Sequence, residues 1–317
     1  MTYNLNLILP VGTQVVLRRA AATGAGRPLA PAGSVGKVVG APTDHTHAYR
    51  VRLVDGTELS LPRTELTIRK HLQAETLAEL GGVLRDHSLD EHVMLRVVVG
   101  SRAYGLDDEE SDVDRRGVYL PPAELHWSLY GVPEQLENVA TEECYWEVGK
   151  FLGLALKANP NILEVLYSPR VEHAAPLAEE LLRERGRFLS KIVYQTYNGY
   201  VMSQFRKLEQ DVRNTGAPRW KHAMHLVRLL VSGITALRDG HVPVRVEEHR
   251  AALLGIKSGA APWDEVNEWR LALHREFDAT LASTRLPDRP DYAWANGYLI
   301  RARRSAVGTE VRECVSA

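Results

Sequence analysis

Residues 94–122, MLRVVVGSRAYGLDDEESDVDRRGVYLPP, form the stretch that decides how the rest of the chain is interpreted. The stretch begins with an apolar run interrupted only by Arg96 and then turns at Gly100 and Ser101. This pattern predicts a short buried strand followed by a tight turn. Backbone N–H groups exposed in such a turn, together with the Ser101 hydroxyl, are suitable donors to phosphate oxygens. The stretch therefore predicts a phosphate site at the end of a strand.

Two aspartates, Asp112 and Asp114, follow this turn and are separated by Val113. Alternation along a strand would place both carboxylates on one face. Neighbouring carboxylates repel each other unless a cation lies between them, and Mg²⁺ prefers one or two carboxylates together with substrate phosphates. The pattern therefore predicts metal-dependent phosphoryl or nucleotidyl transfer. The alternative is that DDEESDVD forms a solvated acidic loop, as most charge runs do, but the apolar runs on both sides favour the metal site.

This order of parts resembles the active-site signature of the DNA polymerase β-like nucleotidyltransferase superfamily. The longer string GSRAYG…SDVDRRGVYLPP resembles the predicted nucleotidyltransferases associated with bacterial RNA repair operons. The resemblance implies an α/β (α+β) core with a mixed sheet, in which Asp112 and Asp114 bind two Mg²⁺ or Mn²⁺ ions. The residues of this segment predicted to bind the nucleotide are Gly100, Ser101, Arg102 and Tyr104. Arg115 departs from the superfamily, which has an apolar residue there, but on a strand it would point away from the metal with Val113.

The superfamily also uses a third carboxylate on a neighbouring strand, and Glu142 and Glu143 are the candidates in this chain. The spacing to Lys150 and Phe151, where the resemblance resumes, favours Glu142. On a strand the two side chains would face opposite sides, so only one of them can join the aspartates. By resemblance, this carboxylate would bind metal and help to activate the attacking hydroxyl, through the metal or as a general base.

Two further strings, KFLGLALKANPNILEVLYSP and WKHAMHLVRLLVSGITALRDG, resemble later blocks of the same family. On a helix, Lys221, His225 and Arg228 fall at i, i+4 and i+7 and form one polar stripe among apolar residues. A cationic stripe on an otherwise buried helix needs an anionic partner, and we expect that partner to be the triphosphate or the carboxylates of the catalytic domain. The alternative is a structural ion pair between helices. Further possible substrate contacts are Arg116, Lys150 and His222.

Three domains are expected along the chain. Residues 1–70 alternate apolar and polar residues between Gly, Pro and Asp-Gly signals, which predicts a small SH3-like or KOW-like β-barrel. Residues 71–170 form the expected catalytic domain, beginning with a helix at 72–90, and residues 171–317 form a helical C-terminal domain. The net charges of the three segments are +5, −10 and +4. An acidic centre between basic flanks suits an RNA substrate, although charge compensation between domains explains it equally well.

The overall composition is that of a soluble globular protein, with 317 residues, 44% hydrophobic and 25% charged. No apolar run of about 18 residues is present, so we expect no membrane partner. The first residues lack a basic segment that precedes an apolar one, and the cysteines are only Cys144 and Cys314, which together favour a cytoplasmic location. The expected function is transfer of an NMP from an NTP to an RNA 3′ end. The alternatives are a protein or small-molecule acceptor, or a non-catalytic nucleotide or RNA sensor.

Overall fold

The computed structural model describes residues 8–22, 28–42, 47–69, 88–108, 111–129, 131–216 and 218–308. Contacts divide the chain into two compact units, residues 1–86 and residues 87–317. The predicted boundary at residue 70 and most of the predicted helix 72–90 lie outside the described residues.

The first unit contains an antiparallel five-stranded sheet in the order β6-β5-β4-β1-β7. Its strands are β1 (Gln14–Leu17), β4 (Val35–Gly40), β5 (Tyr49–Leu53), β6 (Glu58–Leu61) and β7 (Leu66–Ile68). Alternate residues of β5 are buried and exposed, as its sequence predicts, and the turn at Asp55-Gly56 joins β5 to β6. A separate ladder pairs β2 (Ala21–Ala22) with β3 (Pro28–Ala30). Closure of the sheet into an SH3-like barrel stays a prediction.

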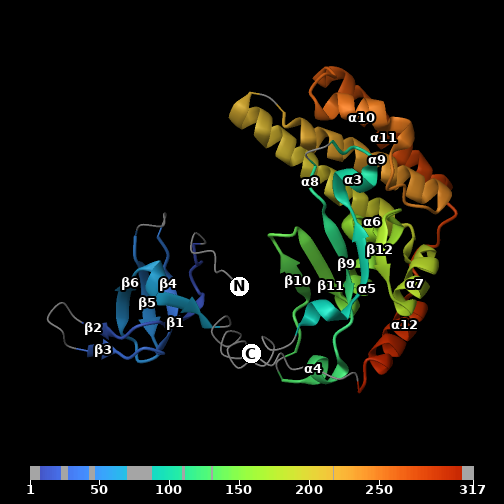
Figure 1. The fold of residues 1–317 in the computed structure, drawn as a ribbon. Coiled ribbons are helices and arrows are strands. Elements are labelled where there is room, and N and C mark those ends of the chain that lie inside the picture. The colour runs from blue at the N-terminus through green and yellow to red at the C-terminus, as the bar shows by residue number, and fades with distance from the viewer. Residues whose placement is uncertain are drawn as a thin grey trace. The chain divides into compact units, whose positions relative to one another are not determined.

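The second unit is built on a mixed five-stranded sheet in the order β10-β11-β9-β8-β12 (Figure 1). Its strands are β8 (Val93–Val98), β9 (Arg115–Tyr119), β10 (Gln135–Asn138), β11 (Glu143–Glu147) and β12 (Val171–Ala174). Strands β9 and β11 are parallel, whereas the other neighbours are antiparallel. The mixed sheet predicted from the sequence is present. It extends through β12, beyond the predicted domain end at residue 170.

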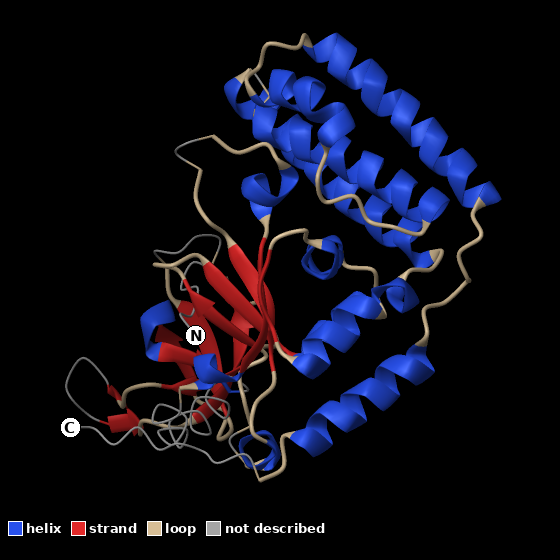
Figure 2. Cartoon of the chain, turned by 45° about the vertical axis from the view of Figure 1, so that its right-hand side comes forward, coloured by secondary structure: helices blue, strands red, loops and turns tan. Residues whose placement is uncertain are grey.

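One group of helices covers this sheet and a second group forms a bundle beyond one end of its strands (Figures 1 and 2). The short helices are α3 (Gly100–Tyr104) and α4 (Ala123–Trp127). The first group consists of α5 (Val148–Ala155), α6 (Pro160–Tyr167), α7 (Pro176–Arg183) and α12 (Tyr292–Ser305). The bundle consists of α8 (Ile192–Thr215), α9 (Trp220–Asp239), α10 (Arg250–Lys257) and α11 (Trp263–Ser283).

A single apolar core joins the sheet to both helix groups. Helix α6 begins where Asn159 accepts hydrogen bonds from the backbone N–H groups of Asn161 and Ile162, with Pro160 at the first helical position. Contacts group the sheet and the later helices in one unit. The three-domain division expected from the sequence stays a prediction. None of the helices in the described segments is long and apolar enough to cross a membrane.

Candidate active site

The turn after β8 lies directly against Asp114. Gly100 has a φ of +71°, a left-handed conformation that glycine adopts without strain. A Cβ atom at this position would lie 2.5 Å from Oδ2 of Asp114. In addition, the backbone N–H of Val99 donates to the carbonyl of Asp114, with an N–O distance of 2.9 Å. Both the backbone conformation and the close approach of the carboxylate therefore favour glycine at position 100.

Both aspartates line one cavity of about 260 Å³ between the sheet end and the helical bundle, which we call the aspartate cavity. Its lining residues are Gly100, Ser101, Tyr104, Leu106, Ser111, Asp112, Asp114, Lys221, Met224, His225 and Lys257. Seven of the residues predicted from the sequence thus come together. Asp112 and Asp114 precede β9, which begins at Arg115, so they reach the same cavity from a loop and not from within the strand.

The two aspartates have different surroundings. The Oδ1 atom of Asp114 lies 3.2 Å from Nη2 of Arg116, and its side chain is half-buried. Asp112 is exposed, and no side chain within the described segments forms an ion pair with its carboxylate. Together they offer the one or two carboxylates that Mg²⁺ takes up when phosphates and water complete its coordination. Among the described residues, no group of three or more His, Cys, Asp or Glu side chains is arranged to hold a metal ion.

Arg102, predicted to bind the nucleotide, instead holds the loop that carries the aspartates. Its Nε and Nη2 atoms donate to the carbonyl of Ser111 at 3.0 and 2.7 Å, and Nε also lies 3.3 Å from the carbonyl of Asp112. Arg102 does not line the aspartate cavity. Its role in the structure is to fix the position of Asp112 relative to α3.

Arg228, also predicted to bind the triphosphate, is buried in an ion pair between helices. Its Nη1 atom lies 2.6 Å from Oε1 of Glu164, and both side chains are about 5% exposed. The guanidinium lies 3.8 Å from the ring centroid of Tyr104, whose hydroxyl donates to Oε2 of Glu164 at 2.5 Å. Burial is the largest single influence and disfavours the charge, but the Glu164 carboxylate together with the nearby Tyr104 and Tyr197 outweighs it, so the pKa of Arg228 is raised. The predicted phosphate contact is therefore replaced by the alternative, a structural ion pair.

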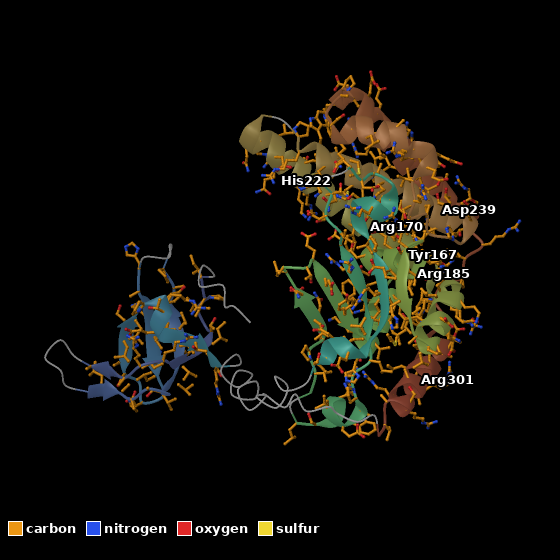
Figure 3. All side chains as sticks on the ribbon, in the orientation of Figure 1. Tyr167, Arg170, Arg185, His222, Asp239 and Arg301 are labelled. Atoms are coloured by element: carbon orange, nitrogen blue, oxygen red, sulfur yellow. The ribbon has the colours of Figure 1, made fainter. Side chains whose placement is uncertain are left out.

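The other histidine and lysine side chains of this part of α9 differ in whether they reach the aspartate cavity. Lys221 and His225 line the aspartate cavity. Burial, followed by repulsion from Arg228 and Lys221, lowers the pKa of His225 to about 3, so its imidazole is neutral at pH 7. His222 (Figure 3) does not line this cavity, and its Nδ1 atom lies 2.8 Å from Oδ2 of Asp211 on α8. The stripe thus provides one cation and one neutral N–H donor to the cavity.

Sequence patterns missed Lys257, a second cation of the aspartate cavity. Its Nζ atom donates to the carbonyl of Leu106 at 3.2 Å and lies 3.4 Å from Oδ2 of Asp108. Arg250 on the same helix donates to the carbonyl of Gly105 at 2.7 Å. Helix α10 thereby holds the loop that follows α3. No motif marks this lysine, because its partners are about 150 residues away in the sequence.

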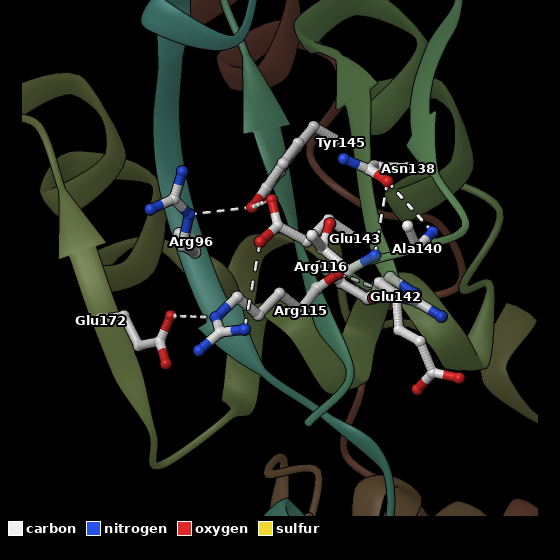
Figure 4. A network of polar contacts seen from close by, with 10 residues as sticks. Arg96, Arg115, Arg116, Asn138, Ala140, Glu142, Glu143, Tyr145 and Glu172 are labelled. Atoms are coloured by element: carbon white, nitrogen blue, oxygen red, sulfur yellow. Dashed lines mark hydrogen bonds and ion pairs between the residues drawn. The ribbon is translucent and has the colours of Figure 1, made fainter. Parts of the chain in front are cut away.

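The two candidates for the third carboxylate lie at the start of β11 (Figure 4). Glu143 accepts the hydroxyl hydrogen of Tyr145, with an O–O distance of 2.8 Å, and lies 4.0 Å from Nη1 of Arg115. It therefore belongs to a network on the sheet face opposite Asp114. The Glu142 carboxylate points away from this network, and its residue has a φ of +53°. Neither glutamate lines the aspartate cavity, so the third carboxylate stays a prediction.

The same network accounts for Arg115, the departure from the superfamily. Its Nε atom lies 2.9 Å from Oε2 of Glu172 (Figure 4). Arg116 faces the Asp114 side, where its Nη1 atom donates to the carbonyl of Glu142 at 2.6 Å. Alternation along β9 thus separates the two arginines onto opposite faces.

A second cavity of about 350 Å³, which we call the sheet cavity, adjoins the first. Its lining residues are Val99, Gly100, Tyr104, Asp114, Arg116, Gln135, Glu137, Cys144, Trp146, Asn161 and Glu164. Lys150, predicted as a substrate contact, lines neither cavity. Its Nζ atom lies 2.7 Å from Oε2 of Glu134, in a third cavity of about 500 Å³ whose lining includes neither aspartate.

Comparisons with known proteins identify the family of this chain. The chain is 34% identical over 106 residues to the uncharacterized protein YcgL of Bacillus subtilis, a match that covers 31% of this chain and 39% of that protein. It is 28% identical over 150 residues to the uncharacterized protein MJ0002 of Methanocaldococcus jannaschii, covering 45% of this chain and 60% of that protein. The chain thus spans less than two thirds of the length of either relative. The model of the RNA repair pathway DNA polymerase beta family matches residues 54–301, and the chain belongs to this family.

Proposed function

We propose that this protein is a metal-dependent nucleotidyltransferase that transfers an NMP from an NTP to the hydroxyl at an RNA 3′ end. The observation that carries the proposal is the aspartate cavity, in which the Gly100 turn, Asp112 and Asp114 meet Lys221 and Lys257. Membership of the family supports a general nucleotidyltransferase role. The acceptor and the metal requirement are the further parts of the proposal.

The charges of the aspartate cavity suit a nucleoside triphosphate with its metal ions. Lys221 and Lys257 supply positive charge, and Ser101 and the neutral His225 supply hydrogen-bond donors to phosphate oxygens. Asp112 and Asp114 would hold Mg²⁺ or Mn²⁺ together with these phosphates, and Glu142 is the predicted third carboxylate. When bound, the ions would neutralise phosphate charge and polarise the reacting phosphoryl group.

The proposed reaction is an in-line substitution at the α-phosphorus. The acceptor oxygen forms a bond to this atom, and the bond from the α-phosphorus to the bridging oxygen breaks. Pyrophosphate leaves with the electron pair, and the hydroxyl proton passes to solvent. The contribution of the chain is to hold the two reactants in line, because positioning and electrostatic stabilisation dominate phosphoryl-transfer catalysis.

Incubation with each of the four α-³²P-labelled NTPs and Mg²⁺ tests this proposal. The acceptors are an RNA with a 3′ hydroxyl, the same RNA with a 3′ phosphate, and an aminoglycoside, and autolabelling of the protein is followed in parallel. We expect label only on the RNA with a free hydroxyl, and loss of labelling in Asp112→Asn and Asp114→Asn. Label on protein or aminoglycoside alone would replace the RNA acceptor. Nucleotide binding without transfer to any acceptor would instead support the sensor alternative.

A further inference from the structure

The sheet cavity is separate from the proposed triphosphate site, yet it opens onto the same aspartate. It shares Gly100, Tyr104 and Asp114 with the aspartate cavity. A nucleotide in one cavity and a second molecule in the other would therefore meet at Asp114. Reacting atoms must approach to about 3–3.5 Å before transfer, and two adjoining cavities that share an aspartate permit this approach.

The two cavities differ in the charges available to a ligand. The aspartate cavity contains Lys221 and Lys257, which suit phosphates. In the sheet cavity the lining cation is Arg116, and its guanidinium already contacts the Asp114 carboxylate and the carbonyl of Glu142. The remaining polar groups offer both acceptors and uncharged donors, from the Glu137 carboxylate and from the side-chain amides of Asn161 and Gln135. This lining suits an uncharged molecule rich in hydroxyl groups better than it suits a phosphate.

Glu137 is the carboxylate of this cavity best placed to meet such a ligand. It lies on β10 directly opposite Cys144 of β11, and it is exposed. Gln135, two residues earlier, donates a hydrogen bond to Oε1 of Glu137, and no described residue donates to the other carboxylate oxygen, which leaves it for a ligand. Glu164, the other glutamate of the lining, is instead buried and paired with Arg228.

We propose that the sheet cavity binds the terminal ribonucleoside of an RNA acceptor, with the reacting 3′ hydroxyl at Asp114 and Glu137 accepting a hydrogen bond from a ribose hydroxyl. This inference rests on the proposed function, whose bond changes it leaves unaltered. A carboxylate is a suitable partner for ribose hydroxyls, as dinucleotide-binding proteins illustrate.

The size of the cavity favours a nucleoside over a protein side chain. A volume of about 350 Å³ falls at the lower end of the roughly 300–1,000 Å³ typical of small-molecule sites. A serine or tyrosine hydroxyl would leave most of this space unfilled, whereas a ribose with its base would occupy it. The ring of Trp146, which lies 6.4 Å from that of Phe151 between centroids, provides an apolar wall.

The test compares Glu137→Ala with Glu134→Ala, a matched loss of one carboxylate three residues away. Glu134 lines the third cavity and pairs with Lys150, so it serves as the control. The substrates are RNAs that end in ribose or in 2′-deoxyribose, and the KM for RNA and the Kd for a nonhydrolysable NTP are measured separately. Asn161→Leu, which places an apolar side chain in the sheet cavity, is a second variant.

We expect Glu137→Ala to raise the KM for ribose-ended RNA about tenfold, the loss expected for one hydrogen bond to a charged group. The preference for ribose over deoxyribose ends should narrow, and the Kd for the NTP should stay within twofold. Asn161→Leu should also raise the KM for RNA, whereas Glu134→Ala should change none of these values. An unchanged KM and ribose preference in both sheet-cavity variants, in a protein that labels RNA, would overturn the acceptor site alone. If the wild-type protein labels only protein, the proposed RNA acceptor site is overturned. If it transfers no nucleotide to any acceptor, the proposed function is overturned together with the acceptor site.

Discussion

Replacing Arg228 by methionine should destabilise the second unit strongly while leaving nucleotide binding to the folded protein nearly unchanged. Glu164 and Arg228 are each about 5% exposed, and their Oε1 and Nη1 atoms are 2.6 Å apart. Removal of the cation leaves the carboxylate buried with Tyr104 as its hydrogen-bond partner. Breaking one side of a buried pair costs about 3–5 kcal/mol. The lost contact between the guanidinium and the Tyr104 ring adds to this cost.

Urea unfolding followed by tryptophan fluorescence measures this loss selectively. All six tryptophans lie in residues 87–317, so the signal reports only the second unit. We expect Arg228→Met to lower the free energy of unfolding by about 3–5 kcal/mol. The control is Arg238→Met on the same helix, whose side chain is 55% exposed, and it should cost under about 1 kcal/mol. In the double variant Glu164→Leu/Arg228→Met the loss should be smaller than in Arg228→Met, because no buried charge is left unpaired.

The competing interpretation, in which Arg228 binds the triphosphate, makes the opposite prediction. It expects a small loss of stability and a large rise in the Kd for the NTP, because the cation would then matter mainly when the nucleotide is bound. A loss under about 1 kcal/mol in Arg228→Met, together with a Kd at least tenfold higher, would refute the structural role. Nucleotide binding is measured by calorimetry below the urea transition so that the folded protein is compared.

Three further predictions concern the aspartate cavity. Gly100→Ala should lower the free energy of unfolding in urea by about 1–2 kcal/mol, because alanine is strained in the left-handed conformation of this residue. It should also lower the single-turnover rate of nucleotide transfer about 100-fold, because the added Cβ atom displaces Asp114. A near-wild-type transfer rate would contradict the role of the Gly100 turn in positioning Asp114. Lys221→Met and Lys257→Met should each raise the Kd for the NTP about tenfold, as measured by calorimetry. An unchanged Kd in both variants would contradict the proposal that the triphosphate binds in this cavity. Burial lowers the pKa of His225 from 6.5 to about 3. Between these two pH values the unfolded chain binds a proton at this imidazole that the folded chain does not bind. The free energy of unfolding should therefore fall as the pH drops below about 6.5, by up to about 1.4 kcal/mol per pH unit. His225→Asn should flatten this dependence in urea unfolding at pH 4–7, and an unaltered slope would contradict the burial of this imidazole.

The sequence predicted the centre of the site well because its signals are local. An apolar run, a Gly-Ser turn and two aspartates within about 20 residues of Met94 predict a strand, a turn and a second strand segment that carries both carboxylates. The two aspartates do line one cavity, although they reach it from the loop before β9. The mixed sheet implied by the family resemblance is also present.

Residues whose partners are distant in the sequence were predicted less well. Helical spacing correctly placed Arg228 among apolar residues, but it did not identify Glu164, 64 residues earlier, as its counter-ion. A single stripe therefore contained both a structural arginine and two cavity residues. Lys257 carried no motif, and its position depends on how α10 packs near the loop after α3. Glu142 and Glu143 are adjacent, and strand alternation would place their side chains on opposite faces. Glu142, however, has a left-handed backbone conformation, so the alternation rule does not predict where its side chain points.

Calorimetric titration of a nonhydrolysable NTP, with and without Mg²⁺, tests the central claim most directly. We expect tight binding by the wild-type protein only with Mg²⁺, and loss of this Mg²⁺ dependence in Asp112→Asn/Asp114→Asn with tryptophan fluorescence unchanged. If the wild-type Kd does not depend on Mg²⁺, or if the double variant keeps the full dependence, the two aspartates do not share a metal ion with the nucleotide.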